Sequence, residues 1–196
     1  MRTDYRKVTQ AVDYLLNKDP SGIGKLKLIK LIWAADRYHV RKYGRFVTED
    51  DYWAMHNGPV GSMTKDVVEF SANEYSPLTE EDLAYVGKYI SNRDAILRPM
   101  ENTDEDMLSE TDKEALDFAW NTFHGLSQQE IIDFTHKYPE WKNQEAIINS
   151  GQKAVDINEA DFFENPSSIE IPNDPFMQNM SEADLQLSRE MFLEYT

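Results

Sequence analysis

"KLKLIKLIWAADRYHVRKYGR", residues 25–45, predicts a helix over about residues 24–43. Apolar side chains recur in it at helical spacing. Those expected to point inward are Leu26, Ile29, Ile32, Trp33 and Val40. Gly44 is expected to end the helix, because glycine readily adopts the left-handed conformation found just after many helices. Three lysines near the start are candidates for contacting a phosphate or an acidic peptide, although cations are unfavourable there: Lys25, Lys27 and Lys30.

Signals for helix starts recur along the chain. Apolar spacing predicts a first helix over about residues 8–18. Thr79, Ser109 and Ser127 are suited to cap the N-termini of later helices. The stretch 85–100 predicts two short strands joined by a turn near residues 92–94. The sequence therefore predicts a mostly helical α+β fold, a compact multi-helix body with a small antiparallel sheet.

"AMHNGPVGSM", residues 54–63, predicts a corner between a short strand and a third helix. Asn57 and Gly58 suit a turn, and Pro59 suits the first turn of a helix because its missing N–H is not needed there. His56 precedes the turn and is expected to pack or hydrogen-bond locally. We interpret this corner as structural and not catalytic, with backbone N–H groups after Pro59 as the one place for an acidic ligand group.

The composition excludes several classes of protein. The chain has 196 residues, no cysteine and a net charge of −16 at pH 7. Such an acidic chain is not expected to bind nucleic acid phosphates, which attract clustered lysine and arginine. It contains no apolar run long enough for a membrane span, and its polar start lacks the apolar core of a secretion signal. A cytoplasmic protein with a basic partner is the expectation.

The composition changes after residue 150. Residues 151–196 carry ten Asp and Glu against Lys153 and Arg189, a net charge of −8, and prolines interrupt them. We expect two parts, a body over 1–150 and an extended acidic arm over 151–196 that ends in a short helix capped by Ser181.

The predicted arm also carries large apolar side chains, which a purely solvating tail would lack. The hypothesis is that they anchor a partner protein, with the alternative that the arm folds back on its own body or on a second copy. The candidate partner-binding residues are Phe162, Phe163, Ile169, Ile171, Phe176, Met177, Leu185, Met191 and Phe192.

The search for catalytic chemistry finds no candidate. Asp36 and His39 lie three residues apart on one helix face, a spacing compatible with a metal-ligand pair and equally with a surface ion pair. His124 and His136 fall near predicted helix C-termini, where histidine interacts favourably with the last carbonyls. Nucleophile motifs and close histidine pairs are absent from the sequence. No catalytic, cofactor-binding or metal-binding residue is therefore assigned.

Three blocks in order resemble the Panacea domain, the family of SocA-like antitoxins and phage-associated proteins. They are "KLKLIKLIWAADRYHVRKYGR", "YWAMHNGPVGSMTKDV" and "LSETDKEALDFAWNTFHGLSQQEIIDFTHKYPEW". With their order and spacing, the resemblance covers about residues 8–145, so the last fifty residues lie outside it. The residues that carry it, taken as a structural motif, are Asp36, His39, Gly44, Asn57, Gly58, Pro59, Val60, His136, Pro139 and Trp141.

The resemblance implies a cytoplasmic antitoxin of a bacterial or phage toxin–antitoxin system. It implies no catalysis and a cognate protein toxin as the partner, and the acidic charge of this chain leads us to expect a basic toxin. Three alternatives stay open: an adaptor that delivers a toxin to a protease, a hydrolase or metal enzyme of unrecognised type, and a DNA-binding autoregulator, which the acidic charge opposes. A homo-oligomer is compatible with all of them.

Overall fold

The computed structural model describes residues 3–72, 76–178 and 180–195. The α-helices are α1 (Tyr5–Lys18), α2 (Lys25–Tyr43), α3 (Ser62–Glu69), α4 (Glu80–Tyr89), α5 (Glu110–Phe123), α6 (Gln128–Thr135), α7 (Pro139–Lys142), α8 (Glu145–Asn149) and α9 (Glu182–Tyr195). Short 3-10 helices are η1 (Glu105–Met107), η2 (Glu159–Phe163) and η3 (Pro175–Met177). The strands are β1 (Ile23–Gly24), β2 (Tyr52–Met55), β3 (Gly58–Gly61), β4 (Ile90–Arg93), β5 (Ile96–Pro99) and β6 (Ala154–Asp156). The predicted mostly helical α+β class is confirmed.

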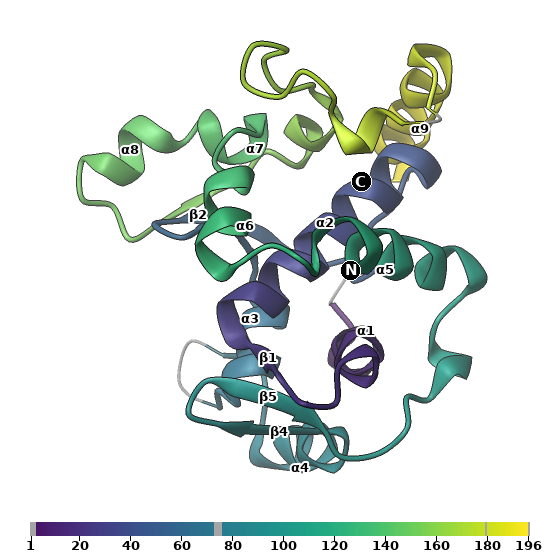
Figure 1. The fold of residues 1–196 in the computed structure, drawn as a ribbon, viewed down its shortest axis with the longest axis vertical. Coiled ribbons are helices and arrows are strands. Elements are labelled where there is room, and N and C mark those ends of the chain that lie inside the picture. The colour runs from purple at the N-terminus through teal and green to yellow at the C-terminus, as the bar shows by residue number, and fades with distance from the viewer. Residues whose placement is uncertain (1–2, 73–75, 179, 196) are drawn as a thin grey trace.

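Helix α2 crosses the middle of the molecule, as Figure 1 shows, and packs against α5, α6 and α9. From Leu28 to Arg41 every side chain except half-buried Tyr38 is buried. The expected inward residues are therefore inside, apart from half-buried Leu26. A helix that is apolar on most sides is a core helix, so its charged residues are carried inside with it.

Local signals set most helix ends where the sequence predicts them. Thr79, Ser109 and Ser127 each form a capping box with the acidic residue three positions later. Ser181 accepts from the Asp184 amide in the same way. Gly44 ends α2 with a left-handed backbone (φ 70°), and its amide donates to the Val40 carbonyl.

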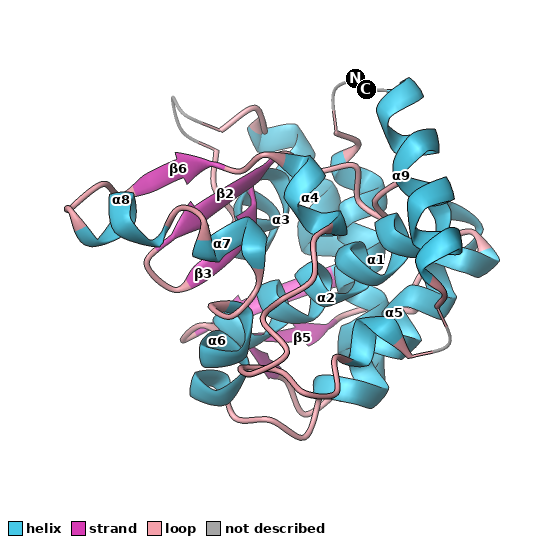
Figure 2. Cartoon of the chain, turned by 90° about the horizontal axis from the view of Figure 1, so that it is seen from above, coloured by secondary structure: helices cyan, strands magenta, loops and turns pink. Residues whose placement is uncertain are grey.

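The strands form two small antiparallel sheets, ordered β1-β5-β4 and β3-β2-β6 among the described residues. Figure 2 shows β6, β2 and β3 side by side. The predicted strand pair over 85–100 is confirmed as β4 and β5, with its turn at Asp94 and Ala95, slightly later than expected. Both turn residues have positive φ, which matches the twist of a tight hairpin.

The predicted strand-to-helix corner is a β-hairpin. Pro59 and Val60 lie in β3, and α3 begins only at Ser62, so the expectation that Pro59 opens a helix is wrong. The reason is a distant cap, because the buried Asp50 carboxylate accepts hydrogen bonds from the amides of Met63 and Thr64. Strand β3 is the edge of its sheet, where the missing N–H of proline is tolerated.

Replacing Gly58 with valine is expected to lower the free energy of unfolding by about 2–4 kcal/mol. Gly58 has φ 101°, and a Cβ there would lie 2.5 Å from Thr135 Oγ1 and 2.9 Å from Lys30 Nζ. Urea unfolding measures the loss. Gly125→Val is the matched control, because a Cβ at Gly125 meets nothing within 4 Å. An unchanged unfolding midpoint for Gly58→Val would contradict this close packing.

The segment after residue 150 folds onto the body, which corrects the expectation of a separate extended arm. Strand β6 pairs with β2 and so joins a sheet of the body. Phe162 packs edge-on against Phe46 and Tyr52. The large apolar side chains explain the difference, because burying them offsets the conformational entropy lost on ordering an acidic segment. The predicted terminal helix is present as α9.

Candidate functional site

Five ionisable side chains of α2 lie in the protein interior. Charged residues are almost never fully buried unless they are paired, so each needs an internal partner. These side chains, all at 0% exposure, are Lys30, Asp36, Arg37, His39 and Arg41. The hydrogen bonds and ion pairs of these side chains decide whether the centre of the molecule has a chemical or a structural role.

Arg37 forms a buried ion pair with Glu140 at the start of α7, with Nη1 2.6 Å from Oε2. The other Glu140 oxygen accepts from the Trp33 indole N–H at 3.0 Å. Arg37 Nη2 donates to the backbone carbonyl of Glu164 at 2.7 Å, and its guanidinium lies over the Tyr138 ring. This pair therefore joins α2, α7 and the C-terminal segment.

Arg41, one turn further along α2, binds the same C-terminal segment. Its Nη1 donates to the carbonyls of Phe162 at 3.0 Å and Glu164 at 3.2 Å, and its Nη2 donates to Asn165 Oδ1 at 2.6 Å. Four hydrogen bonds of Arg37 and Arg41 thus end on residues 162–165, and the Glu164 carbonyl accepts two of them. The two guanidinium groups hold that segment against α2 mainly through its backbone.

Asp36 and His39 have separate partners, so they form neither a metal-ligand pair nor a surface ion pair, the two arrangements with which their spacing is compatible. Asp36 accepts hydrogen bonds from the amide and hydroxyl of Thr48 and from the Tyr52 hydroxyl. Burial raises the pKa of Asp36 to about 6, although these hydrogen bonds oppose the shift. His39 lies between the Arg45 carbonyl and Thr111, and burial lowers the pKa of His39 to about 4. The imidazole is neutral at pH 7.

Lys30 has no ion pair among residues 3–72, 76–178 and 180–195. Its ammonium donates to the Pro59 carbonyl at 2.6 Å, beside the β2–β3 hairpin. Burial lowers the pKa of Lys30 to about 7. Lys25 pairs with Glu69 and Lys27 donates to the His124 carbonyl, so all three lysines singled out in the sequence bind within the chain.

Replacing Lys30 with methionine is expected to raise the free energy of unfolding by about 1–3 kcal/mol at pH 6, because burial disfavours the ammonium. The lysine pKa is about 7 in the folded chain and 10.5 in the unfolded one. The unfolded chain therefore holds the extra proton between these values, so wild-type stability rises with pH across that window. The gain from the substitution should accordingly shrink by about pH 10.

Urea unfolding of both proteins at the two pH values measures this difference. Lys153→Met is the matched control, since Lys153 is exposed. A Lys30→Met protein that is less stable than wild type at pH 6 would contradict the prediction.

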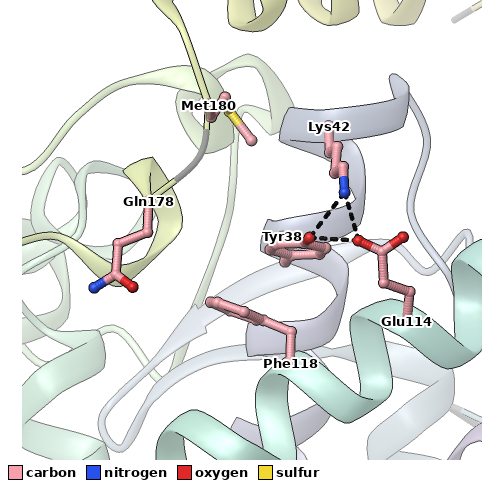
Figure 3. A pocket seen from close by; sticks show the side chains of 6 residues that line it. All are labelled: Tyr38, Lys42, Glu114, Phe118, Gln178 and Met180. Atoms are coloured by element: carbon pink, nitrogen blue, oxygen red, sulfur yellow. Dashed lines mark hydrogen bonds and ion pairs between the residues drawn. The ribbon is translucent and has the colours of Figure 1, made fainter.

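A groove of about 320 Å³ lies where α2 and α5 meet the segment before α9 (Figure 3). It is lined by Tyr38, Lys42, Glu114, Phe118, Gln178 and Met180. Glu114 Oε1 accepts from the Tyr38 hydroxyl and the Lys42 ammonium, both at 2.5 Å. Burial alone would raise the pKa of Glu114, but the hydrogen bonds from Lys42 and the two neighbouring tyrosines lower it to about 2.

The charges of Glu114 and Lys42 in this groove therefore neutralise each other. Its apolar wall is the stacked pair Tyr38 and Phe118, with ring centroids 4.2 Å apart. The groove suits an uncharged or aromatic side chain better than a charged ligand.

The geometry described so far lies mainly within the part of the chain that has known relatives. The family model for the antitoxin SocA-like Panacea domain matches residues 28–142, more than half of the chain. The chain belongs to this family. Comparisons with curated proteins and with solved structures gave no match. The resemblance stated from the sequence is confirmed, over a span that begins later than expected.

Within the Panacea domain, the motif residues are part of the packed framework. His136 stacks on Trp141 with ring centroids 3.7 Å apart, and the Trp141 indole donates to the Met55 carbonyl at 2.8 Å. Pro139 is the first residue of α7 and so positions Glu140. The other motif residues lie on α2, at its C-cap or in the β2–β3 hairpin, namely Asp36, His39, Gly44, Asn57, Gly58, Pro59 and Val60.

The nine candidate partner-binding residues, all C-terminal to the matched span, divide by burial. Five are core residues and do not present a surface: Phe162, Phe163, Ile171, Phe176 and Phe192. Met177 and Leu185 are half-buried. Ile169 is 90% exposed and Met191 is 42% exposed. The five buried residues are thus corrected from partner anchors to core, since they pack against apolar groups of the body.

Sequence reasoning missed the buried charges of Lys30, Arg37, Arg41 and Glu140. A signal was present, because residues 28–35 place apolar side chains on every side of the helix apart from Lys30. A helix without a polar face is buried, and its charged residues are buried with it.

Among residues 3–72, 76–178 and 180–195, no helix is long and apolar enough to cross a membrane. In the same ranges, no cluster of three or more His, Cys, Asp or Glu side chains is arranged to hold a metal ion.

Proposed function

We propose that this protein is the antitoxin of a bacterial or phage toxin–antitoxin pair, and that it neutralises a protein toxin by binding it directly. The observation that carries the proposal is the SocA-like Panacea match over residues 28–142. The acidic net charge of −16 favours a basic toxin, because complementary charge speeds association and disfavours other acidic partners.

The interior of the domain supports a binding role without turnover. Asp36 hydrogen-bonds with Thr48 and Tyr52, and His39 hydrogen-bonds with the Arg45 carbonyl and Thr111. A general acid or base must instead reach a substrate, so these groups serve the scaffold. The buried Arg37 and Arg41 hold the C-terminal segment against the body. This segment is therefore part of the folded structure that a toxin would contact.

The test begins with the reading frame next to this gene. That frame is expressed from an inducible promoter, alone and together with this protein, and growth is measured. We expect the neighbour alone to stop growth and co-expression to restore it. The two purified proteins should also elute as one complex in size-exclusion chromatography. A neighbour that remains toxic and forms no complex would overturn the proposal.

The same cells separate binding from delivery to a protease. Under direct neutralisation, the amount of toxin on an immunoblot stays constant when this protein is co-expressed. Under the adaptor alternative, the amount falls, and deletion of the housekeeping proteases restores both the toxin and its toxicity.

A further inference from the structure

Helix α9 carries apolar side chains on more than the side that packs against the body. Its inner side is buried through Ser188 and Phe192, and the Phe192 ring lies 5.4 Å from Phe163 and 5.9 Å from Phe46. The helix approaches α2 closely, because a Cβ at Gly44 would lie 2.9 Å from the Ser188 carbonyl. Helix α9 is therefore fixed to the body along this side.

The remaining sides of α9 present large apolar groups to solvent. Leu187 is 59% exposed and Leu193 is 56% exposed, whereas Met191, 42% exposed, lies toward α2, because a Cβ at Gly44 would be 3.0 Å from its Cβ. The two leucines lie within seven residues of one helix, whereas single scattered apolar residues are the rule on protein surfaces. At about 100° per residue, Glu190 and Glu194 lie between Leu187 and Leu193 around the helix. We call these four residues the outer face of α9. Figure 1 shows α9 at one end of the molecule.

The charge around these groups is acidic. The acidic residues of α9 are Glu182, Asp184, Glu190 and Glu194. Among the described parts of the chain, no cation forms an ion pair with any of them. Arg189, the one basic residue of α9, is directed to Glu164 at 3.4 Å. A second copy of this face would bring like charges together, so an apolar contact here requires a basic partner.

We propose that the outer face of α9 docks a basic, amphipathic helical segment of the toxin. The inference rests on the proposed function, and it names the surface and the chemistry of the partner. Leu187 and Leu193 would contact the apolar side of that segment, while Glu190 and Glu194 would face its lysines and arginines. Helix α9 lies outside the matched span 28–142, so the Panacea match does not itself assign this contact.

The first test uses a defined probe and the full chain. The probe is a synthetic helical peptide of Lys and Leu, of the same length as α9, and a Glu/Leu peptide of the same pattern is its counterpart. Calorimetric titration should show that wild type binds the Lys/Leu peptide and not the Glu/Leu peptide. Leu187→Gln with Leu193→Gln should weaken binding by about tenfold or more, because both apolar contacts are lost while helix propensity is kept.

Matched variants identify the site. Met100 is 59% exposed and lies outside α9, so Met100→Gln should bind like wild type. Glu190→Gln with Glu194→Gln should weaken binding and flatten its dependence on salt. Glu80→Gln with Glu81→Gln removes the same charge from α4 and should do neither. Equal binding by the α9 variants and wild type would overturn the docking surface, as would equal losses in the α4 and α9 charge variants.

The growth assay distinguishes failure of this inference from failure of the proposed function. Protection by wild type and Met100→Gln, and none by Leu187→Gln with Leu193→Gln, supports the docking surface. Full protection by that double variant removes the docking surface and leaves the antitoxin proposal standing. No protection by wild type removes the antitoxin proposal itself, whatever the peptide binds.

Discussion

A chain that ends at residue 156 is expected not to fold cooperatively. The removed segment contributes four buried rings to the core: Phe162, Phe163, Phe176 and Phe192. Emptying the site of one buried phenylalanine costs about 3–5 kcal/mol. Four such losses approach or exceed the whole stability of a typical domain, about 5–15 kcal/mol. The truncation also leaves Arg37 and Arg41 without acceptors at residues 162–165.

Thermal unfolding followed by circular dichroism measures this effect. A chain that ends at residue 180 is the control, because it lacks α9 but keeps Phe162 and Phe176. It should fold with a lower melting temperature, since Phe192 alone is lost from the core. A chain of residues 1–156 that melts cooperatively near the full-length temperature would show that the C-terminal segment is dispensable to the core.

Replacing Arg37 with methionine is expected to lower the free energy of unfolding by about 3–5 kcal/mol. The substitution leaves the Glu140 carboxylate, at 0% exposure, without its cation. It also removes the bond to the Glu164 carbonyl. The size of the loss comes from the uncompensated buried charge and not from the attraction within the pair.

A double variant separates these two contributions. Arg37→Met with Glu140→Leu removes both charges and should recover a large part of the loss, as the two replacements are apolar and of similar volume. Urea unfolding of wild type, both single variants and the double variant gives the coupling energy. A double variant less stable than Arg37→Met would contradict this account.

Features encoded within a few residues could be predicted from the sequence. A serine or threonine cap and its acidic partner lie three positions apart, as at Ser109 and Asp112, so the motif identifies the helix start. Gly44 marked the end of α2 for a similar reason. The start of α3 could not be found this way. Its cap, Asp50, lies 13 residues before Met63 and is positioned by the β2–β3 hairpin.

The candidate site depends even more on distant contacts. The Arg37–Glu140 pair joins residues 103 positions apart, so no local pattern predicts that either side chain is buried. The same limitation explains the C-terminal segment. Its acids and prolines are typical of a disordered tail. The segment is ordered instead, because Phe162 packs against Phe46 and Tyr52, which lie far away in the sequence. Asp36 and His39 were noted for their spacing, but that spacing could not reveal their partners, which are Thr48 and Tyr52 for Asp36 and Arg45 and Thr111 for His39.

The way Arg37 and Arg41 hold residues 162–165 sets which sequence changes the attachment tolerates. Three of the four hydrogen bonds there end on the main-chain carbonyls of Phe162 and Glu164, so the guanidinium groups do not depend on which side chain stands at position 164. Substitutions of the exposed Glu164 therefore leave this attachment intact, whereas a substitution of Asn165 removes the one side-chain acceptor of the segment. Inserting or deleting one residue between Phe162 and Glu164 shifts the carbonyls out of register with α2. The segment can thus vary in composition far more freely than in length.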